Sequence, residues 1–282
     1  MISTLININS KHAVANNKYV FKFNKPIQFT ENDTLSIENL TMYNSMFNIT
    51  ARKQTNTFKF IWNADTITEY NVIMEDQYLD VVGLEAYMKR KCIELDLYLI
   101  DAQGNALVYM AINTISNLYD IEFVSNPLPT ESERISMALS YPPNATWRCS
   151  NESRNMQLTV NNSFGEIFGF TAGTYPKLSS SIISSSRSVI TPQVIKSNTL
   201  LIGCNIIHNE MSDFSNILTG IAINSSFGGV INYIGASGSA SNCFRTQVSE
   251  IEFTFYDHFF DELNMIDRNI NIIVNIRKSK TI

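Results

Sequence analysis

Short runs in which apolar and polar residues alternate recur along most of the chain. In residues 3–9, for example, Thr4, Ile6 and Ile8 would share one face of an extended strand. Alternation with a period of two predicts a strand with one buried face and one solvent-exposed face. We therefore expect strands at 3–9, 19–23, 35–40, 58–62, 106–112, 118–124, 135–139, 156–160, 199–207, 230–234, 251–255 and 270–276.

One segment follows a different period. Within residues 77–96, apolar residues recur at intervals of three and four, and charged residues occupy the positions between them. This spacing predicts an amphipathic helix. A short helix is also expected at 213–218, with Asp213 as its cap. A fold built from alternating strands and helices would need several segments like 77–96, so the pattern predicts an all-β architecture with one dependable helix.

The chain has 282 residues, of which 44% are hydrophobic, and this length can form one large all-β domain. The middle of the chain is less regular, because Pro127, Pro129, Pro142 and Pro143 interrupt it. We interpret 1–282 as a single domain with a possible insertion around 98–160. The Ser-rich residues 177–198 predict an exposed connection or a ragged edge strand.

Charge and cysteine content narrow the possible partners and compartments. The formal net charge is -5 with only 21 Lys and Arg residues, so no broad basic face for nucleic acid is expected. The basic run at 277–280 is interpreted as a solvated chain end in preference to a tail that contacts DNA. The four cysteines are widely spaced and form no C-x-x-C pair, which indicates a reducing compartment. We expect no secretory signal and no membrane span.

Candidate catalytic residues are few. His12, His208 and His258 are isolated, and no zinc, P-loop or nucleophile-elbow motif accompanies them. A Cys–His hydrolase would require His208 to meet Cys243 or Cys204 in space. Cys204 lies in an apolar strand pattern, where a thiolate is disfavoured. We therefore predict that the chain is not an enzyme, and we assign no catalytic, cofactor-binding or metal-ligating residue and no cofactor.

Two other groups of side chains admit both a functional and a structural interpretation. Acidic residues before the last strand could bind Ca²⁺ or act in glycoside hydrolysis, but Asp is also common in turns, which is the interpretation we prefer. Several aromatic side chains could line a sugar site, although core packing is the simpler use. The acidic residues are Asp257, Asp261, Glu262 and Asp267; the aromatic residues are Trp62, Tyr70, Trp147, Phe164, Phe168 and Phe170.

Three stretches resemble the penton-type single jelly-roll minor capsid proteins of virophages and polinton-like viruses. The first is LTMYNSMFNI at 40–49, followed by NTFKF at 56–60. The second is NSFGEIFGF at 162–170. The third is the carboxy-terminal series of strands, with segments at 200–207, 216–218, 228–233, 251–257 and 269–276. Each stretch is short, and it is their order along the chain that carries the resemblance.

The resemblance implies a jelly-roll β-sandwich that assembles as a homopentamer at the vertices of an icosahedral capsid. It also implies contact with a double jelly-roll major capsid protein, location in the virion, and synthesis in the host cytoplasm. The middle region could then carry a spike or receptor contact. A jelly-roll carbohydrate-binding or host-attachment module is the alternative, and a hydrolase is a third hypothesis that the scattered histidines disfavour.

Overall fold

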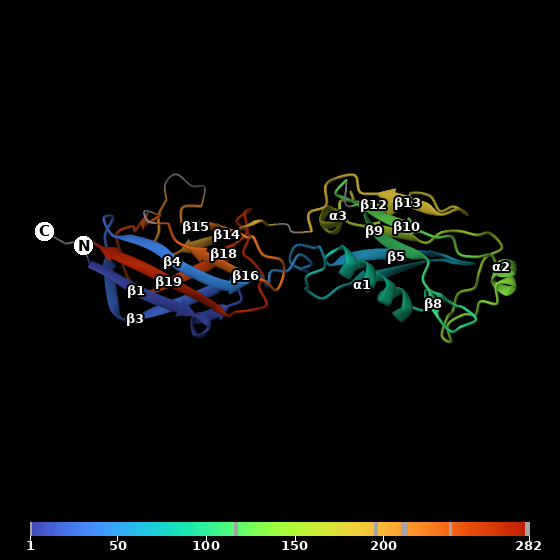
Figure 1. Ribbon diagram of the computed structural model, residues 1–282, viewed down its shortest axis with the longest axis horizontal. Helices are drawn as coiled ribbons and strands as arrows, with labels where there is room; N and C mark the ends of the chain where they lie inside the picture. Colours follow the sequence, from blue (N-terminus) through green and yellow to red (C-terminus); the bar gives the residue numbers. More distant parts are fainter. Residues whose placement is uncertain (1, 116–117, 195–196, 210–213, 237–238, 280–282) are drawn as a thin grey trace. The chain divides into compact units, whose positions relative to one another are not determined.

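The computed structural model describes residues 2–115, 118–194, 197–209, 214–236 and 239–279 (Figure 1). The chain divides into two compact units. One consists of Met1–Phe47 together with Ser197–Ile282, and we call it the discontinuous unit. The other, Asn48–Lys196, is the inserted unit. Each unit has its own cluster of buried hydrophobic side chains.

Two antiparallel sheets form the discontinuous unit. The first contains, in spatial order, β1 (Ile2–Asn9), β19 (Ile270–Lys278), β4 (Thr34–Tyr43) and β16 (Val230–Ile234), and the short β17 (Ser241–Asn242) also pairs with β4. The second contains β15 (Ile217–Ala222), β14 (Thr199–Cys204), β18 (Thr246–Tyr256), β3 (Lys18–Phe29) and the short β2 (Ala13–Ala15). The 3-10 turn η1 (Ser10–His12) lies between β1 and β2.

The strand order defines the fold. Without the short β2 and β17, this unit has eight strands among the described residues, and in chain order they form one sheet as 1-8-3-6 and the other as 5-4-7-2. Every connection except that between the fourth and fifth strands passes from one sheet to the other. Two four-stranded antiparallel sheets connected in this way are a jelly roll. The inserted unit interrupts it between the third strand, β4, and the fourth, β14.

The alternation seen in the sequence produces the core of this jelly roll. On β18, Ile251, Phe253 and Phe255 are buried, whereas Glu252 faces outward and pairs with Lys18 at 2.9 Å. The rings of Phe255 and Tyr19 meet edge to face with centroids 5.6 Å apart. Both sheets contribute side chains to one core, as expected when each buries a single face.

The inserted unit is also rich in strands. One sheet has the order β12 (Gly173–Tyr175), β11 (Gln157–Val160), β5 (Thr57–Asn63), β6 (Ile67–Ile73), and another has the order β13 (Ser184–Arg187), β10 (Asp120–Ser125), β9 (Met110–Ile115). The strands β7 (Leu99–Ile100) and β8 (Ala106–Leu107) form a separate pair. The helices are α1 (Val81–Glu94), α2 (Glu131–Ser136) and α3 (Asn162–Phe168).

Helix α1 is the amphipathic helix that the sequence predicts. Its first turn is capped by Asp80, whose Oδ1 accepts a hydrogen bond from the Gly83 N–H at 2.7 Å. Leu84, Met88 and Cys92 lie on its buried face. The helix packs against β9, so its apolar stripe completes the core of the inserted unit.

The all-β jelly-roll prediction is confirmed, and two local details of the sequence interpretation are wrong. Among the described residues, two short helices accompany α1, which is the one dependable helix that was expected. The strand expected at 135–139 is instead the end of α2 and a turn, because Thr130 and Glu133 form a capping box that starts a helix. The prediction of a helix at 213–218 is also wrong, because Ile217 is the first residue of β15. Asp213, the predicted cap of that helix, lies outside the described residues.

The inserted unit is larger than the insertion we expected around 98–160. It also includes β5, β6 and α1 on one side and residues 161–196 on the other. Strand β5 pairs with β11, and this pairing ties residues 57–63 to the inserted unit. The alternation of β5 predicts a strand but does not indicate which sheet the strand joins.

Candidate functional site

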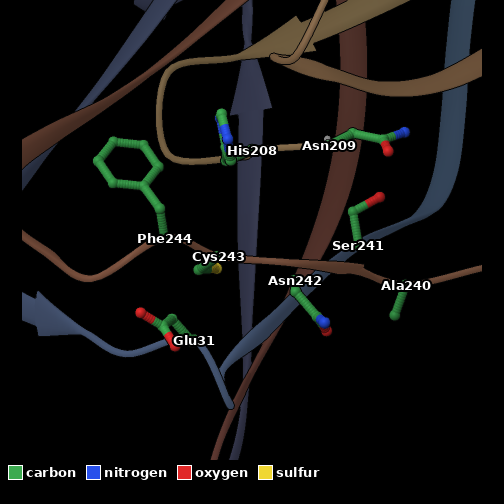
Figure 2. Close-up of a pocket in the computed structure, with 8 residues that line it drawn as sticks. All are labelled: Glu31, His208, Asn209, Ala240, Ser241, Asn242, Cys243 and Phe244. Carbon is green, nitrogen blue, oxygen red and sulfur yellow. The ribbon is translucent and has the colours of Figure 1, made fainter. Parts of the chain in front are cut away.

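The histidine and cysteine that we considered as a catalytic pair line the same hollow. His208 and Cys243 come close because Ile207 and Cys243 form an isolated β-bridge and the Phe244 N–H donates to the Ile206 oxygen at 3.1 Å. The hollow has a volume of about 580 Å³ and belongs to the discontinuous unit (Figure 2). It is lined by Glu31, His208, Asn209, Ala240, Ser241, Asn242, Cys243 and Phe244.

The arrangement does not activate the thiol. The side chain of Cys243 is buried, and burial, with a smaller contribution from Asp33, raises its pKa to about 12. Figure 2 shows the imidazole of His208 directed away from Cys243, and no hydrogen bond between these two described residues is present. Cys204 is buried as well, and burial likewise raises its pKa to about 12. A nucleophilic cysteine needs a lowered pKa, so the geometry opposes the hydrolase hypothesis.

We predict that Cys243 does not react with Ellman's reagent in the native protein near pH 8. With a pKa of about 12, roughly one thiol in ten thousand is ionised at that pH. The other cysteines, Cys92, Cys149 and Cys204, are also free and buried. The coloured thiolate of Ellman's reagent should therefore be released only as the protein unfolds in urea. If the native protein rapidly released one equivalent of this thiolate and the Cys243→Ser variant did not, the prediction would be contradicted.

The acidic residues before the last strand form a turn. Oδ1 of the buried Asp257 accepts hydrogen bonds from the N–H groups of Phe259 and Asp261, at 2.9 and 3.0 Å. The carboxylate thus closes the turn itself, in agreement with the turn interpretation. In the described part of the chain, no three His, Cys, Asp or Glu side chains are placed to share a metal ion.

The aromatic residues considered for a sugar site are mostly core residues. Trp62, Trp147, Phe164, Phe168 and Phe170 are all buried in the inserted unit, and Tyr70 is partly buried against the same cluster. The two tryptophans meet edge to face, with ring centroids 4.9 Å apart. The core-packing interpretation is therefore confirmed for five of the six.

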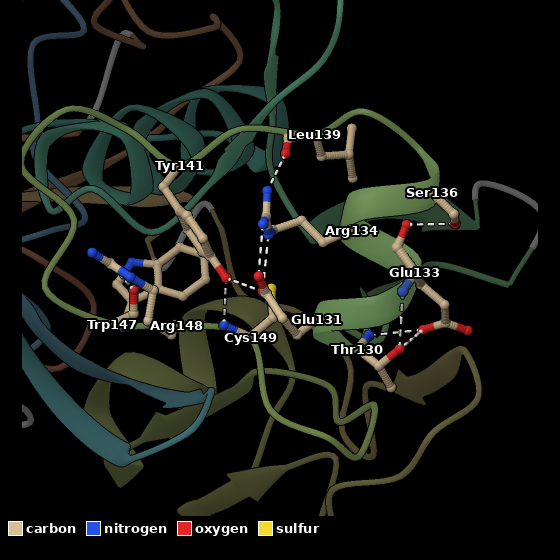
Figure 3. A network of polar contacts seen from close by, with 10 residues as sticks. All are labelled: Thr130, Glu131, Glu133, Arg134, Ser136, Leu139, Tyr141, Trp147, Arg148 and Cys149. Atoms are coloured by element: carbon tan, nitrogen blue, oxygen red, sulfur yellow. Dashed lines mark hydrogen bonds and ion pairs between the residues drawn. The ribbon is translucent and has the colours of Figure 1, made fainter.

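A network of charged and aromatic side chains fixes the loops around α2 (Figure 3). Glu131 accepts hydrogen bonds from Arg134 Nε at 2.9 Å, from Arg134 Nη2 at 2.6 Å and from the Tyr141 hydroxyl at 2.5 Å. The Tyr141 oxygen in turn accepts from the Cys149 N–H at 2.8 Å. The guanidinium groups of Arg134 and Arg148 lie 4.6 and 4.8 Å from the centre of the Tyr141 ring. The network joins α2 to the chain that follows it.

Glu131→Gln should destabilise the inserted unit at neutral pH but not in acid. Hydrogen bonds from Arg134, and then from Tyr141, lower the pKa of Glu131 from 4.5 to about 2. The stabilisation is therefore complete above pH 4.5 and is lost as the pH falls toward 2. Because the Glu131 side chain is 37% exposed, we expect the substitution to lower the free energy of unfolding by at most about 1 kcal/mol. The measurement is the thermal unfolding of the unaltered protein and of Glu131→Gln from neutral pH down to about pH 2. An equal difference in stability between the two proteins at every pH would contradict the prediction.

A buried polar residue with several long-range hydrogen bonds in the inserted unit was missed by the sequence analysis. Asn155 is fully buried, and its Nδ2 donates to the oxygens of Ile182 and Ser125 at 2.6 and 3.2 Å. Its Oδ1 accepts from the Ser180 N–H at 2.6 Å. Asn155 thus anchors the Ser-rich segment. No local pattern marks it, because its partners are some 25 to 30 residues away.

The chain was compared with family models, with curated proteins and with solved structures. No family model matches the sequence, and no curated protein matches it. Among solved structures, the chain is similar to the crystal structure of the mavirus penton protein, with 12% sequence identity and a TM-score of 0.45 over 98% of this chain and 97% of that one. The jelly-roll assignment rests on the strand order described above, independently of this similarity. None of the described helices is both long enough and apolar enough to cross a membrane.

Proposed function

We propose that this chain is a structural protein of an icosahedral virus, located at the capsid vertices of the virion. In this proposal it forms a homopentamer and contacts the surrounding double jelly-roll major capsid protein. The strand order of the discontinuous unit carries the proposal, because the eight-stranded jelly roll is a fold of viral capsid proteins. Jelly rolls also serve as lectins and cupins, so the order of the three sequence stretches and the surface chemistry supply further support.

The outer face of the first sheet suits contact between copies. A row of neutral polar side chains crosses its four strands in register: Asn9, Asn271, Thr41 and Asn232. Ile234 on the same sheet is 79% exposed. A chain with a net charge of -5 is repelled by its own copies, and a neutral face minimises this repulsion. A closed ring also needs a second, different surface on each subunit.

The test combines sedimentation velocity with electron microscopy of particles. The purified protein should sediment as a pentamer, or as a monomer that joins particles at their fivefold vertices. Thr41→Lys should weaken assembly, because it places a charge in the neutral row, while Gln247→Lys, an exposed position on β18 of the other sheet, should not. A stable trimer, or protein found only away from the vertices, would contradict the proposal.

A carbohydrate-binding or host-attachment module is the second candidate, and one observation favours it. The inserted unit has a hollow of about 600 Å³ lined mainly by side chains that can form hydrogen bonds with hydroxyl groups. It is lined by Asn63, Ile67, Glu152, Ser153, Arg154, Gln157 and Ser179–Ser181. A glycan array probed with intact protein tests this function. A bound glycan that is lost in Arg154→Ala would support it, and an array without a binder would count against it.

A further inference from the structure

The first strand has an unprotected edge. Among the residues that the structure describes, β1 pairs with β19 on one side and with no strand on the other. Its sequence, ISTLININ, contains no charged residue and no proline, and Ile2 and Leu5 are 64% and 65% exposed. Exposed edges are normally protected by Lys, Pro or a bulge, because their free N–H and C=O groups accept a further strand. An edge of this kind is suited to pairing.

An apolar groove runs beside this edge. It lies between β1 and β3, which are neighbours at one side of the discontinuous unit (Figure 1), and has a volume of about 470 Å³. Its lining is mostly apolar and contains two lysines, Lys22 and Lys278, but no acidic residue. The lining residues are Thr4, Leu5, Ile6, Asn7, Phe21, Lys22, Phe23, Asn24, Ile27, Phe29, Ile276 and Lys278.

The two lysines have carboxylates in their surroundings: the charge of Lys278 helps to lower the pKa of Asp33, and Lys22 lies opposite Glu250 in the register of β3 and β18. The Lys278 ammonium lies 4.9 Å from the centre of the Phe29 ring and donates to the Gln28 oxygen. Lys22 is solvent-exposed. Within the described ranges, neither lysine forms an ion pair. Although the chain has a net charge of -5, the lining of this groove combines apolar side chains with two positive charges and no negative charge.

We propose that β1 and this groove bind an extended segment of a partner protein. The segment adds to the free edge of β1 through main-chain hydrogen bonds and places alternate apolar side chains in the groove. Acidic side chains at its ends lie near Lys22 and Lys278. A second copy pairing through its own β1 would bring like lysines together, and β1 carries no carboxylate to offset them. The inference does not depend on the function proposed above.

Fluorescence anisotropy with a synthetic peptide tests the proposal on the full chain. The probe is a labelled peptide of about ten residues in which valine and threonine alternate and both ends carry glutamate. It should bind about tenfold more tightly than the same peptide with alternate N-methylated amides, and about tenfold more tightly than a version with lysine ends. Hydrogen exchange should slow in β1 and remain unchanged in β16.

Three exposed positions supply the variants. Leu5→Lys should weaken binding of the glutamate-ended peptide about tenfold. Lys22→Glu should weaken it similarly and improve binding of the lysine-ended peptide, a reversal that misfolding does not produce. Ile234→Lys, at the opposite edge of the same sheet, is the matched control and should bind normally. Equal binding of all three peptides, equal weakening by Ile234→Lys, or self-association through β1 without peptide binding would overturn the proposal.

Discussion

Phe255→Ala should lower the free energy of unfolding of the discontinuous unit by about 3–5 kcal/mol. Phe255 has no exposed surface and packs edge to face on Tyr19, where the two sheets share their core. Alanine removes the ring and leaves a cavity that the surrounding strands fill only in part. Urea unfolding followed by circular dichroism measures the change.

The matched control for this variant is Phe259→Ala. Phe259 is 56% exposed, so its loss should change stability by less than about 0.5 kcal/mol. Both tryptophans of the chain, Trp62 and Trp147, lie in the core of the inserted unit, so tryptophan fluorescence reports on that unit alone. Phe255→Ala should therefore leave the urea concentration at the midpoint of the fluorescence transition unchanged. A loss of stability no larger than that of Phe259→Ala would contradict the assignment of Phe255 to the core.

Asn155→Ala should destabilise the inserted unit by about 2–4 kcal/mol. The substitution removes the side-chain hydrogen bonds to Ser125, Ser180 and Ile182, of which the bond to the Ser125 oxygen is fully buried. The tryptophan fluorescence transition in urea should move to lower urea concentration. Limited proteolysis should also cut more rapidly within 177–184, because Asn155 anchors this segment.

Asn71→Ala is the control for Asn155→Ala, since Asn71 is an exposed amide on β6 of the same unit. It should change stability by less than about 0.5 kcal/mol. If Asn155→Ala behaved like this control, the segment would be held by other contacts and the role assigned to Asn155 would be wrong.

Sequence periodicity predicts the strands whose two faces have different environments. On β18 and β19, the apolar residues of one face lie in the core and most residues of the other face are polar, so alternation marks these strands directly. Helix α1 is equally clear because its buried side chains recur at helical spacing. The short helix α2 was missed because apolar residues at 135–139 fit a strand, whereas the capping box at Thr130 favours a helix.

Sheet membership and the contacts between distant segments could not be read from periodicity. Apolar and polar residues alternate in β5 as clearly as in any strand of the jelly roll, yet β5 belongs to the inserted unit and pairs there with β11. The neutral row can be recognised only from the register of four strands, which aligns Asn9, Asn271, Thr41 and Asn232. His208 and Cys243 line the same hollow through long-range pairing as well, because Ile207 and Cys243, 36 positions apart, form a β-bridge and Phe244 donates to the Ile206 oxygen. These features depend on long-range pairing, which a local pattern does not encode.

The interrupted jelly roll is tested most directly by removing the inserted unit. A chain in which a short glycine-serine linker replaces residues 48–196 retains all eight strands of both sheets and their shared core. Circular dichroism in urea should show β-structure that unfolds in one cooperative transition, and Phe255→Ala should shift this transition as it does in the full chain. An unfolded chain, obtained with short and long linkers alike, would contradict the account.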